Sequence, residues 1–179
     1  LLEALKKYFN RAGISLLIDK KLSDLTDLIE YKYEIIGYKR GLLSKPGLMS
    51  NIRKAKYDLV IILNPLFQGA WIAYFSGAKY RLGYIKDYEG IQDIEKISSL
   101  LTHPVLSVNK PMHDIQRYLE IAGFLGIETA PPFPKLSIPE GAIKWADAFL
   151  RDNGVKRNDF IVGVNPHAGW KSRCWDTKR

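Results

Sequence analysis

The clearest strand signal in the sequence is Tyr57-Asp58-Leu59-Val60-Ile61-Ile62-Leu63, which is followed directly by Asn64-Pro65. The run is apolar at successive positions and rich in β-branched residues, which is typical of a strand covered on both faces. A helix is predicted next over residues 67–76, with Gly77 as its stop, and a second strand over residues 80–85. Two strands that flank a helix form a βαβ unit, which indicates a parallel sheet.

The same alternation of strands and helices extends on both sides of this unit. Upstream, the hydrophobic spacing predicts helices over residues 1–12, 21–30 and 45–57 and strands over residues 14–18 and 33–38, with Ser23 or Asp24 capping the second helix. Downstream, it predicts a polar loop region with at most one short element over residues 86–111, helices over 114–125 and 139–153, and a strand over 160–164. Asp114 is the expected cap of the helix over 114–125, which Gly126 ends. We therefore expect an α/β fold whose parallel sheet carries helices on both faces.

The composition is that of a soluble globular protein. The 179 residues are 46% hydrophobic and 26% charged, which excludes collagen-like, coiled-coil and disordered chains. Lysine and arginine number 27 against 19 aspartate and glutamate residues, so the formal net charge is +8. This excess favours an anionic partner, such as a nucleotide phosphate, a nucleic acid or an acidic membrane surface, without choosing among them.

One stretch has the length of a membrane span. Residues 59–78 contain no charged side chain, and 20 such residues are enough to cross a bilayer as a helix. Asn64-Pro65 and Gln68-Gly69 interrupt this stretch, and Pro65 removes a backbone donor and disfavours helical geometry at the residue before it. We expect a buried strand, a loop and a helix instead of a span.

Cysteine usage indicates a reducing compartment. Cys174 is the single cysteine, so neither an internal disulfide nor a cysteine-based zinc site is expected. This pattern is typical of a cytoplasmic protein, and no signal peptide is visible at Leu1. Leu1 already belongs to an amphipathic pattern, and residues 176–179 fall where a further helix is expected to begin. We therefore expect both ends to be interior positions of a longer chain.

Several catalytic signatures are absent from the sequence. There is no Gly-x-Gly-x-x-Gly dinucleotide fingerprint, no Walker phosphate loop, no Gly-x-Ser-x-Gly and no His-Glu-x-x-His. His103, His113 and His167 lack the spacing of metal ligands, and no metal site is expected. Structural or capping roles are the better interpretation for His103 and His113.

A basic stretch over residues 39–56 contains no acidic residue. Its cations are Lys39, Arg40, Lys45, Arg53, Lys54 and Lys56. Two interpretations remain open, namely a solvated helix face with its loop, and a patch that binds a phosphorylated or otherwise anionic acceptor. No aromatic residues are interleaved in the way that nucleic-acid binding favours.

The most informative segment is Val162-Gly163-Val164-Asn165-Pro166-His167-Ala168-Gly169-Trp170-Lys171-Ser172-Arg173-Cys174-Trp175. A strand is predicted to end here in a turn of small residues, followed by two cations just before a helix. Small residues allow backbone N–H groups to approach an anion, and a helix N-terminus adds partial positive charge. Lys171 and Arg173 could complete a diphosphate site. An ordinary strand-to-helix loop with solvated cations is the alternative.

Residues 165–175 resemble the motif that opens the C-terminal domain of the bacterial lipopolysaccharide heptosyltransferases, glycosyltransferase family 9. In that family Asn-Pro-Gly-Ala and a few polar residues precede Lys-Arg-Trp-Pro. Two further resemblances follow the same order along the chain. The first comprises residues 57–61, Gly77-Ala78 and Arg81-Leu82-Gly83-Tyr84, and the second comprises His113-Asp114, Arg117-Tyr118-Leu119 and Leu125-Gly126-Ile127.

The resemblance implies one half of a GT-B fold, in which two Rossmann-like domains face each other across a cleft. Residues 1–155 would form the N-terminal, acceptor-side domain without its first strand, and residues 156–179 the truncated start of the nucleotide-sugar-binding domain. The parent enzyme would transfer a heptose from ADP-heptose to the phosphorylated inner core of lipid A, with inversion and without a metal or cofactor. It would be cytoplasmic, with peripheral contact to the inner membrane surface, and no nucleic-acid partner is expected.

The resemblance also implies site residues. Arg173 matches the family's phosphate-binding lysine, and we expect the donor phosphates to be bound by His167, Ala168, Gly169, Trp170, Lys171 and Arg173. Asn64 and Gln68 align with the acceptor-side loop, although the basic residue usual there is absent. The family's catalytic aspartate lies just before the helix that begins here at Leu1, so no catalytic base is expected within these residues, and this chain alone should be inactive.

Two alternatives remain open at the level of the sequence. One is another GT-B glycosyltransferase with a different nucleotide-sugar donor, which the departures from the family pattern at Gln68 and at His167 leave open. The other is a basic α/β module, without catalytic activity, that binds nucleic acid or anionic lipid. The second alternative requires binding that weakens steeply with salt.

Overall fold

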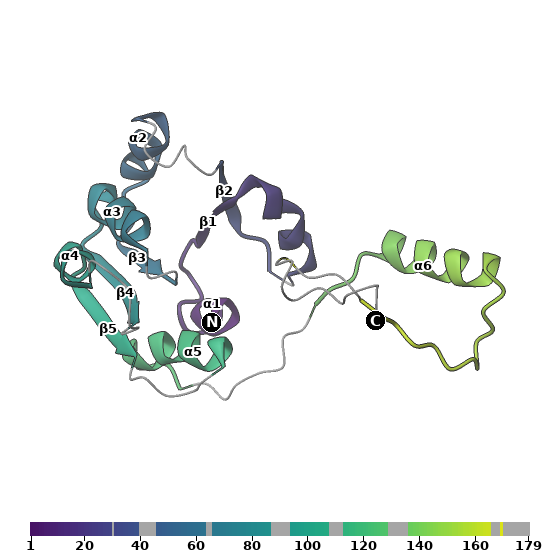
Figure 1. Ribbon diagram of the computed structural model, residues 1–179. Helices are drawn as coiled ribbons and strands as arrows, with labels where there is room; N and C mark the ends of the chain where they lie inside the picture. Colours follow the sequence, from purple (N-terminus) through teal and green to yellow (C-terminus); the bar gives the residue numbers. More distant parts are fainter. Residues whose placement is uncertain are drawn as a thin grey trace. The chain divides into compact units, whose positions relative to one another are not determined.

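The computed structural model describes residues 1–29, 31–39, 46–63, 66–86, 94–107, 113–128, 136–165 and 169 (Figure 1). The chain divides into two compact units, Leu1–Ser137 and Ile138–Arg179. The first unit carries all of the described strands. The domain boundary expected at residues 155/156 concerns the second domain of a longer protein and stays a prediction.

A three-stranded parallel sheet is the centre of the first unit. Its strands are β3 (Leu59–Ile62), β4 (Tyr80–Lys86) and β5 (His103–Ser107), in the order β3-β4-β5. Leu59 pairs with Tyr80, and Leu82 pairs with His103. The strands predicted over 57–63 and 80–85 are therefore confirmed as parallel neighbours.

Helices cover both faces of this sheet, as the sequence predicts. On one face α3 (Phe67–Ser76) and α4 (Ile94–Leu100) form a core in which Ala70 and Ile97 pack with Ile62 and Ile85. On the other face α1 (Leu2–Tyr8) and α5 (Asp114–Phe124) pack against the sheet, and the core there contains Leu82, Ile121 and Ile61. Ile61 and Ile62 are adjacent in the chain and face opposite cores, because side chains alternate along a strand. Helix α2 (Pro46–Lys54) packs against α3 (Figure 1).

A second parallel sheet contains the two strands at the beginning of the chain. Strand β1 (Ser15–Asp19) pairs with β2 (Glu34–Tyr38), so that Ser15 is opposite Glu34. The connection is a 3-10 helix, η1 (Lys20–Leu28), rather than an α-helix. Its cap is Asp19, which accepts a hydrogen bond from the Lys21 amide at 3.1 Å, and neither of the predicted caps, Ser23 and Asp24, takes this place. Among the described residues the strands therefore form two sheets and not the single sheet expected.

The structure corrects the prediction for residues 86–111. The described part of this stretch contains both α4 and the strand β5, where at most one short element was expected. Ile94, Ile97 and Leu101 recur at helical spacing, and Ile97 and Leu101 are buried at 4% and 7% exposure. Strand β5 contains Pro104, which suggests a break in the sequence but is tolerated on an edge strand.

The cap of α5 is also different from the prediction. His113, and not Asp114, is the N-cap, because its imidazole Nδ1 accepts a hydrogen bond from the Ile115 amide at 3.2 Å. The Gln116 side chain accepts in return from the His113 amide at 3.3 Å, which completes a capping box. A capping role for His113 is thereby confirmed.

The second unit contains α6 (Glu140–Asp152), which matches the helix predicted over 139–153. The rings of Trp145 and Phe149 in α6 stack at a centroid distance of 5.4 Å, yet no residue of α6 is buried. The strand predicted over 160–164 is wrong, since these residues are exposed and form no strand, and Phe160 is 93% exposed. A strand is held by hydrogen bonds to a neighbouring strand, and the described residues of this unit offer none.

No helix among the described residues is both long enough and apolar enough to cross a membrane. The uncharged stretch over 59–78 instead contains β3 and α3, as the sequence predicts. Gly77 ends α3 with a left-handed φ of 75°, which an L-residue with a side chain adopts only with strain.

Candidate active site

The carboxyl end of β3 is the part of the expected acceptor loop that the structure describes. Leu63 follows β3, and Gln68 lies exposed in the first turn of α3. Asn64 lies outside the described residues. The N-cap of α3 is Leu66, which has no side-chain oxygen with which to cap the first-turn N–H groups. In parallel α/β sheets this edge is where ligands bind, and an acceptor-side role for Gln68 stays a prediction.

Apolar side chains accompany Gln68 at this edge. Leu66 is 55% exposed and Phe67 is 43% exposed. Helix α3 contains no charged residue, so its first turn presents one amide side chain within an apolar surface. The basic residue usual in the family's loop has no counterpart in this turn.

The expected donor-phosphate residues fall almost entirely outside the described part of the chain. His167, Ala168, Trp170, Lys171 and Arg173 all lie there, so their grouping stays a prediction. Gly169 is described as an exposed bend residue. The described residues just before this segment, 160–165, are exposed as well.

The structure describes four of the six basic residues in the stretch over 39–56. Lys39, Arg53, Lys54 and Lys56 are exposed, whereas Arg40 and Lys45 lie outside the described residues. Arg53 and Lys54 occupy the last turn of α2, where cations interact favourably with the partial negative charge of the helix terminus. Exposure agrees with both open interpretations, a solvated surface and an anion-binding patch.

Arg81 and Gly83, which belong to the family-like sequence, have structural roles. The Arg81 guanidinium donates from Nε to the Leu100 carbonyl and from Nη1 to the Ala78 carbonyl, both at 2.9 Å. A Cβ at Gly83 would lie 2.5 Å from Cδ1 of Leu101, the residue after α4, so any larger residue at this position of β4 would crowd that side chain. Both residues stabilise the sheet that carries the candidate site. The sequence alone did not distinguish this structural role from direct contact with a substrate.

His103 is also structural, as expected. Its Nδ1 lies 2.8 Å from the Thr102 hydroxyl, and its ring lies between those of Tyr80 and Phe124, with both centroid distances at 5.9 Å. It stands at the beginning of β5, which is the sheet edge opposite to the carboxyl ends of the strands. A direct part in a reaction at that opposite edge is therefore excluded by position.

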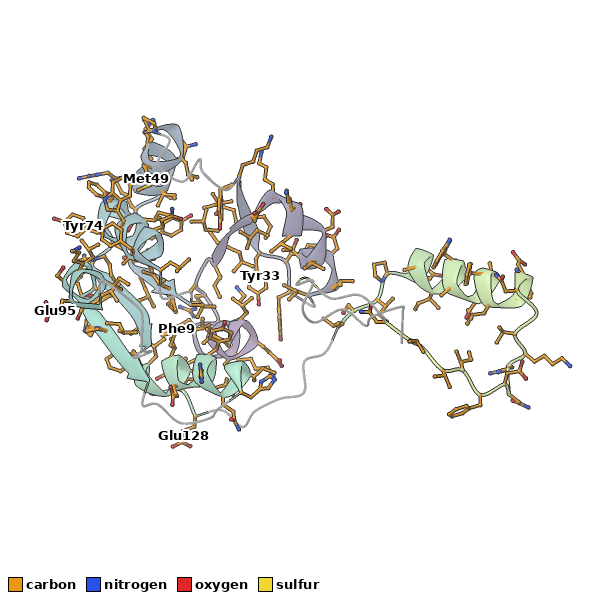
Figure 2. All side chains as sticks on the ribbon, viewed as in Figure 1. Phe9, Tyr33, Met49, Tyr74, Glu95 and Glu128 are labelled. Carbon is orange, nitrogen blue, oxygen red and sulfur yellow. The ribbon has the colours of Figure 1, made fainter. Side chains whose placement is uncertain are left out.

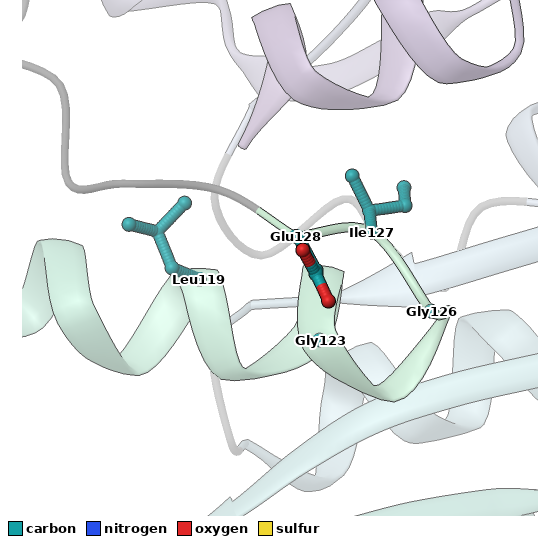
Figure 3. Close-up of a pocket in the computed structure, with 5 residues that line it drawn as sticks. All are labelled: Leu119, Gly123, Gly126, Ile127 and Glu128. Carbon is teal, nitrogen blue, oxygen red and sulfur yellow. The ribbon is translucent and has the colours of Figure 1, made fainter.

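A shallow hollow of about 450 Å³ lies at the C-terminal end of α5 (Figure 3). Its lining residues are Leu119, Gly123, Gly126, Ile127 and Glu128. Glu128 is the charged residue among them, and its carboxylate would repel a diphosphate. The hollow does not suit a nucleotide-sugar donor. Among the described residues no three His, Cys, Asp or Glu side chains gather into a possible metal site.

Tyr33 is half-buried, and its hydroxyl oxygen is a buried polar atom that the sequence does not indicate. Its hydroxyl has no hydrogen-bond partner among the described residues, and it lies near α1 (Figure 2). Burial raises the pKa of this phenol above its usual value, and Tyr31 and Glu3 add to the effect. The pattern Tyr31-Lys32-Tyr33 before β2 gave no sign of a buried hydroxyl.

Comparison with known proteins gives the chain a family context. Residues 47–179 match the model of glycosyltransferase family 9 (heptosyltransferase). The chain is similar to the crystal structure of the family 9 glycosyl transferase from Veillonella parvula DSM 2008, with a TM-score of 0.72 and 23% identity, covering 98% of this chain and 50% of that chain. It is also similar to the ADP-heptose LPS heptosyltransferase II of E. coli, with a TM-score of 0.62 and 18% identity, covering 88% of this chain and 46% of that chain.

These likenesses show the fold. Both neighbours are GT-B glycosyltransferases, so the expected α/β fold of one half of such an enzyme is confirmed. The chain spans about half the length of these two structures. No curated protein matches the sequence significantly.

Proposed function

Because the chain belongs to glycosyltransferase family 9, the heptosyltransferase family, we propose that its parent protein transfers a heptose from ADP-heptose to the lipopolysaccharide inner core. The single observation that carries this proposal is the family match over residues 47–179. The net charge of +8 supports it, because the donor and the phosphorylated acceptor are both anionic. The protein would act in the cytoplasm, in peripheral contact with the inner membrane that holds the acceptor.

The donor side of the proposed reaction rests on residues 167–173. An inverting transfer leaves a nucleoside diphosphate, whose developing charge must be stabilised by fixed positive groups. Arg173 would bind this diphosphate through two parallel hydrogen bonds, and Lys171 would add a second charge. The backbone N–H groups of His167, Ala168, Gly169 and Trp170 would complete the anion site. This arrangement needs no metal ion.

The acceptor side rests on Asn64 and Gln68, at the carboxyl end of β3. The attacking hydroxyl of the acceptor must lose a proton to a general base as it bonds to the anomeric carbon. We expect this base just upstream of Leu1. Leu1 supports the idea, since it packs on the same cluster as Leu63, which follows β3. A residue shortly before Leu1 would therefore lie close to the carboxyl end of β3.

The decisive experiment measures sugar transfer by the complete parent protein. We expect transfer from ADP-heptose to a heptose-deficient lipopolysaccharide core, with inversion at the anomeric carbon and no loss of rate in EDTA. The residues 1–179 alone should give no transfer. Transfer only from a different nucleotide sugar would instead establish the alternative GT-B enzyme.

A matched pair of variants tests the donor site. Arg173→Ala should lower kcat/KM by about 100-fold or more, as removal of a transition-state charge partner does. Arg157→Ala removes an exposed cation sixteen positions upstream in the same unit, and it should leave kcat/KM within about twofold. Equal kinetics for the two variants would remove the proposed phosphate role of Arg173.

A binding experiment tests the basic-module alternative, which the exposed cations Arg53, Lys54 and Lys56 favour. That alternative requires binding of duplex DNA or anionic vesicles that falls steeply between about 50 and 200 mM salt. Salt-resistant binding of ADP-heptose, with no such binding of DNA, would support the glycosyltransferase.

A further inference from the structure

Helix α3 buries mostly small residues and leaves its aromatic residues on the outside. The buried side consists of Ala70, Ile72, Ala73 and Ser76. The opposite side, which we call the aromatic stripe, consists of Phe67, Trp71, Tyr74 and Phe75. These four positions share one face of a helix, because they follow the spacing i, i+4, i+7 and i+8. Trp71 is half-buried and the other three side chains are exposed.

The rings of the aromatic stripe contact one another along the helix. The ring centroids of Trp71 and Phe75 lie 4.2 Å apart, and those of Tyr74 and Phe75 lie 5.3 Å apart with the rings edge to face. Figure 2 shows Tyr74 on the outer side of α3. The stripe is therefore a continuous aromatic surface, and continuous exposed apolar surfaces mark sites of interaction.

Positive charge accompanies one end of the aromatic stripe. Helices α2 and α3 pack against each other, and they lead into the parallel strands β3 and β4, so both helices end at the same edge of the sheet (Figure 1). The last turn of α2 exposes Arg53 and Lys54 at that edge, and the exposed Lys79 lies between α3 and β4. Residues 39–56 contain no acidic side chain. An anionic partner is thus favoured at this surface.

Helix α6 also exposes aromatic rings, but its charges do not favour an anionic partner. Trp145 and Phe149 are exposed, and they are four positions apart, like Trp71 and Phe75. Helix α6 contains three acidic and two basic residues, whereas α3 has no charged residue and α2 has two basic and no acidic residues. Charge complementarity to an anionic surface therefore distinguishes the stripe of α3 from the similar ring pair of α6.

The area of the aromatic stripe argues against a second copy of the chain as its partner. Ten helical residues are about 15 Å long, and a helix is about 10 Å wide, so the stripe covers on the order of 150 Å². A stable protein interface buries about 800 Å² on each partner. A bilayer sets no such minimum, because single aromatic rings enter its headgroup region and each cation adds to the attraction.

We propose that the aromatic stripe of α3, together with Arg53 and Lys54 of α2, binds the protein to the surface of an anionic lipid bilayer. The rings lie at the level of the headgroups, and the two cations pair with lipid phosphates. Because α3 begins after the carboxyl end of β3, a bound α3 keeps this edge, where the acceptor is expected, at the bilayer surface. The inference rests on the proposed function for the choice of the inner membrane.

Co-sedimentation of the complete parent protein with lipid vesicles tests the proposal. We expect binding to vesicles of equimolar phosphatidylcholine and phosphatidylglycerol and little binding to phosphatidylcholine alone. Phe75→Gln should weaken the binding about 10-fold, because one inserted ring is lost. Phe149→Gln is the matched control, since it also removes an exposed ring four positions after a tryptophan, and it should change binding by less than about twofold.

A second pair of variants tests the cations and does not alter the aromatic stripe. Replacing Arg53 and Lys54 together by Gln should weaken binding about 5-fold for each charge. The same replacement of the exposed neighbours Lys156 and Arg157 is the control, and it should have less than about a twofold effect. Circular dichroism checks that each variant is folded. If Phe75→Gln does not fold, the cation variants still decide between binding through this surface and binding elsewhere.

Three results would overturn the proposal. The first is no preference for vesicles that contain phosphatidylglycerol. The second is a loss of binding in the controls as large as that in the variants of Phe75, Arg53 and Lys54. The third is self-association that Phe75→Gln abolishes, without vesicle binding, which would assign the stripe to a second copy.

Sugar transfer to a deacylated, water-soluble core acceptor separates this proposal from the proposed function. Phe75→Gln should retain this transfer while its vesicle binding is weakened. Transfer without any vesicle binding would refute the membrane surface alone. Vesicle binding through the aromatic stripe, without transfer by the original protein, would refute the proposed function alone.

Discussion

The guanidinium of Arg81 holds the end of one helix against the start of a strand, through a 2.9 Å hydrogen bond from Nε to the carbonyl of Leu100. Its Nη1 donates to Ala78 at 2.9 Å, and its charged group lies 5.6 Å from the ring centroid of Tyr74. Tyr74 itself is 49% exposed on α3 (Figure 2). One side chain thus joins the C-terminal ends of α3 and α4 to β4, and a cation there also complements the helix termini.

Replacing Arg81 by Met should therefore destabilise the protein. Met keeps the length of the side chain but leaves two carbonyl groups without a charged donor, and we expect a loss of about 2–3 kcal/mol in the free energy of unfolding. Arg81→Lys, with one nitrogen, should recover part of this loss. Urea denaturation measures both. Lys79→Met is the control, because Lys79 is exposed and its Nζ lies 5.1 Å from the centroid of the Tyr80 ring. A loss of stability as large as that of Arg81→Met would contradict the specific role of Arg81.

Gly83→Ala should destabilise the junction of β4 with α4. The new Cβ would lie 2.5 Å from Cδ1 of Leu101, which is only 7% exposed and cannot move freely, so we expect a cost of about 1–3 kcal/mol. Leu101→Ala in the same chain makes room, and the double variant should be less destabilised than the sum of the two single variants. Thermal or urea unfolding of all four proteins measures this coupling.

Gly123 provides the matched comparison for Gly83. It lies within α5, and a Cβ there would have no heavy atom within 4 Å. Gly123→Ala should raise the free energy of unfolding by about 0.5–1 kcal/mol, because glycine is a poor helix residue. Equal destabilisation by Gly123→Ala and Gly83→Ala would show that crowding by Leu101 is not the cause.

Removal of the His113 cap should weaken α5. His113→Ala leaves the Ile115 amide without its acceptor, and we expect a loss of about 1 kcal/mol. His113→Asp retains an oxygen acceptor and adds a negative charge at the helix N-terminus, so its stability should equal or exceed that of the original protein. Circular dichroism during urea unfolding distinguishes them. Identical curves for the Ala and Asp variants would argue against capping as the function of His113.

Tyr33 should make the protein sensitive to alkali. Burial raises the pKa of its phenol, so the folded protein keeps this proton at a pH at which the unfolded chain has released it. Its contribution to stability is fully present below about pH 10, the value of the unfolded chain, and is lost as the pH rises through the raised pKa. Tyr33→Phe cannot ionise and should lack this part of the loss.

The measurement is the free energy of unfolding of both proteins between neutral and alkaline pH. At neutral pH Tyr33→Phe should be as stable as the original or up to about 1 kcal/mol more stable, because it removes a buried hydroxyl that has no partner among the described residues. The difference should then grow in favour of Phe above about pH 10. Parallel alkaline curves would show that Tyr33 ionises as freely when folded as when unfolded.

The sequence was sufficient where local signals agreed with the tertiary structure. The apolar run of β3 predicted a parallel strand, which is confirmed although its residues are only half-buried, and Gly77 predicted the end of α3. It was insufficient where packing overrides propensity. Pro104 obscures the sequence signal of β5, and this strand forms because β4 provides its hydrogen-bond partners. Residues 160–164 have the composition of a strand but no neighbouring strand among the described residues, and composition cannot supply one.

The candidate site was predictable only through motif resemblance. Gln68 lies at the carboxyl edge of the sheet, as βαβ topology requires, whereas the cations Lys171 and Arg173 fall outside the described residues. Hydrophobic periodicity carries no information on which polar side chains converge from distant segments. The structural roles of Arg81 and Gly83 depend on contacts with Leu100 and Leu101, some twenty residues away, and no local pattern announces such contacts.

The glycines that follow α3 and α5 adopt a left-handed backbone conformation. Gly77 and Gly126 have φ values of 75° and 76°, which are mirror-image conformations for an L-amino acid. Both are exposed, so a D-alanine introduced by chemical ligation should fit without strain at either position, while L-alanine should cost about 1–2 kcal/mol. These two helices therefore end where one residue can adopt a positive φ, which favours a D-residue or glycine over an L-residue with a side chain.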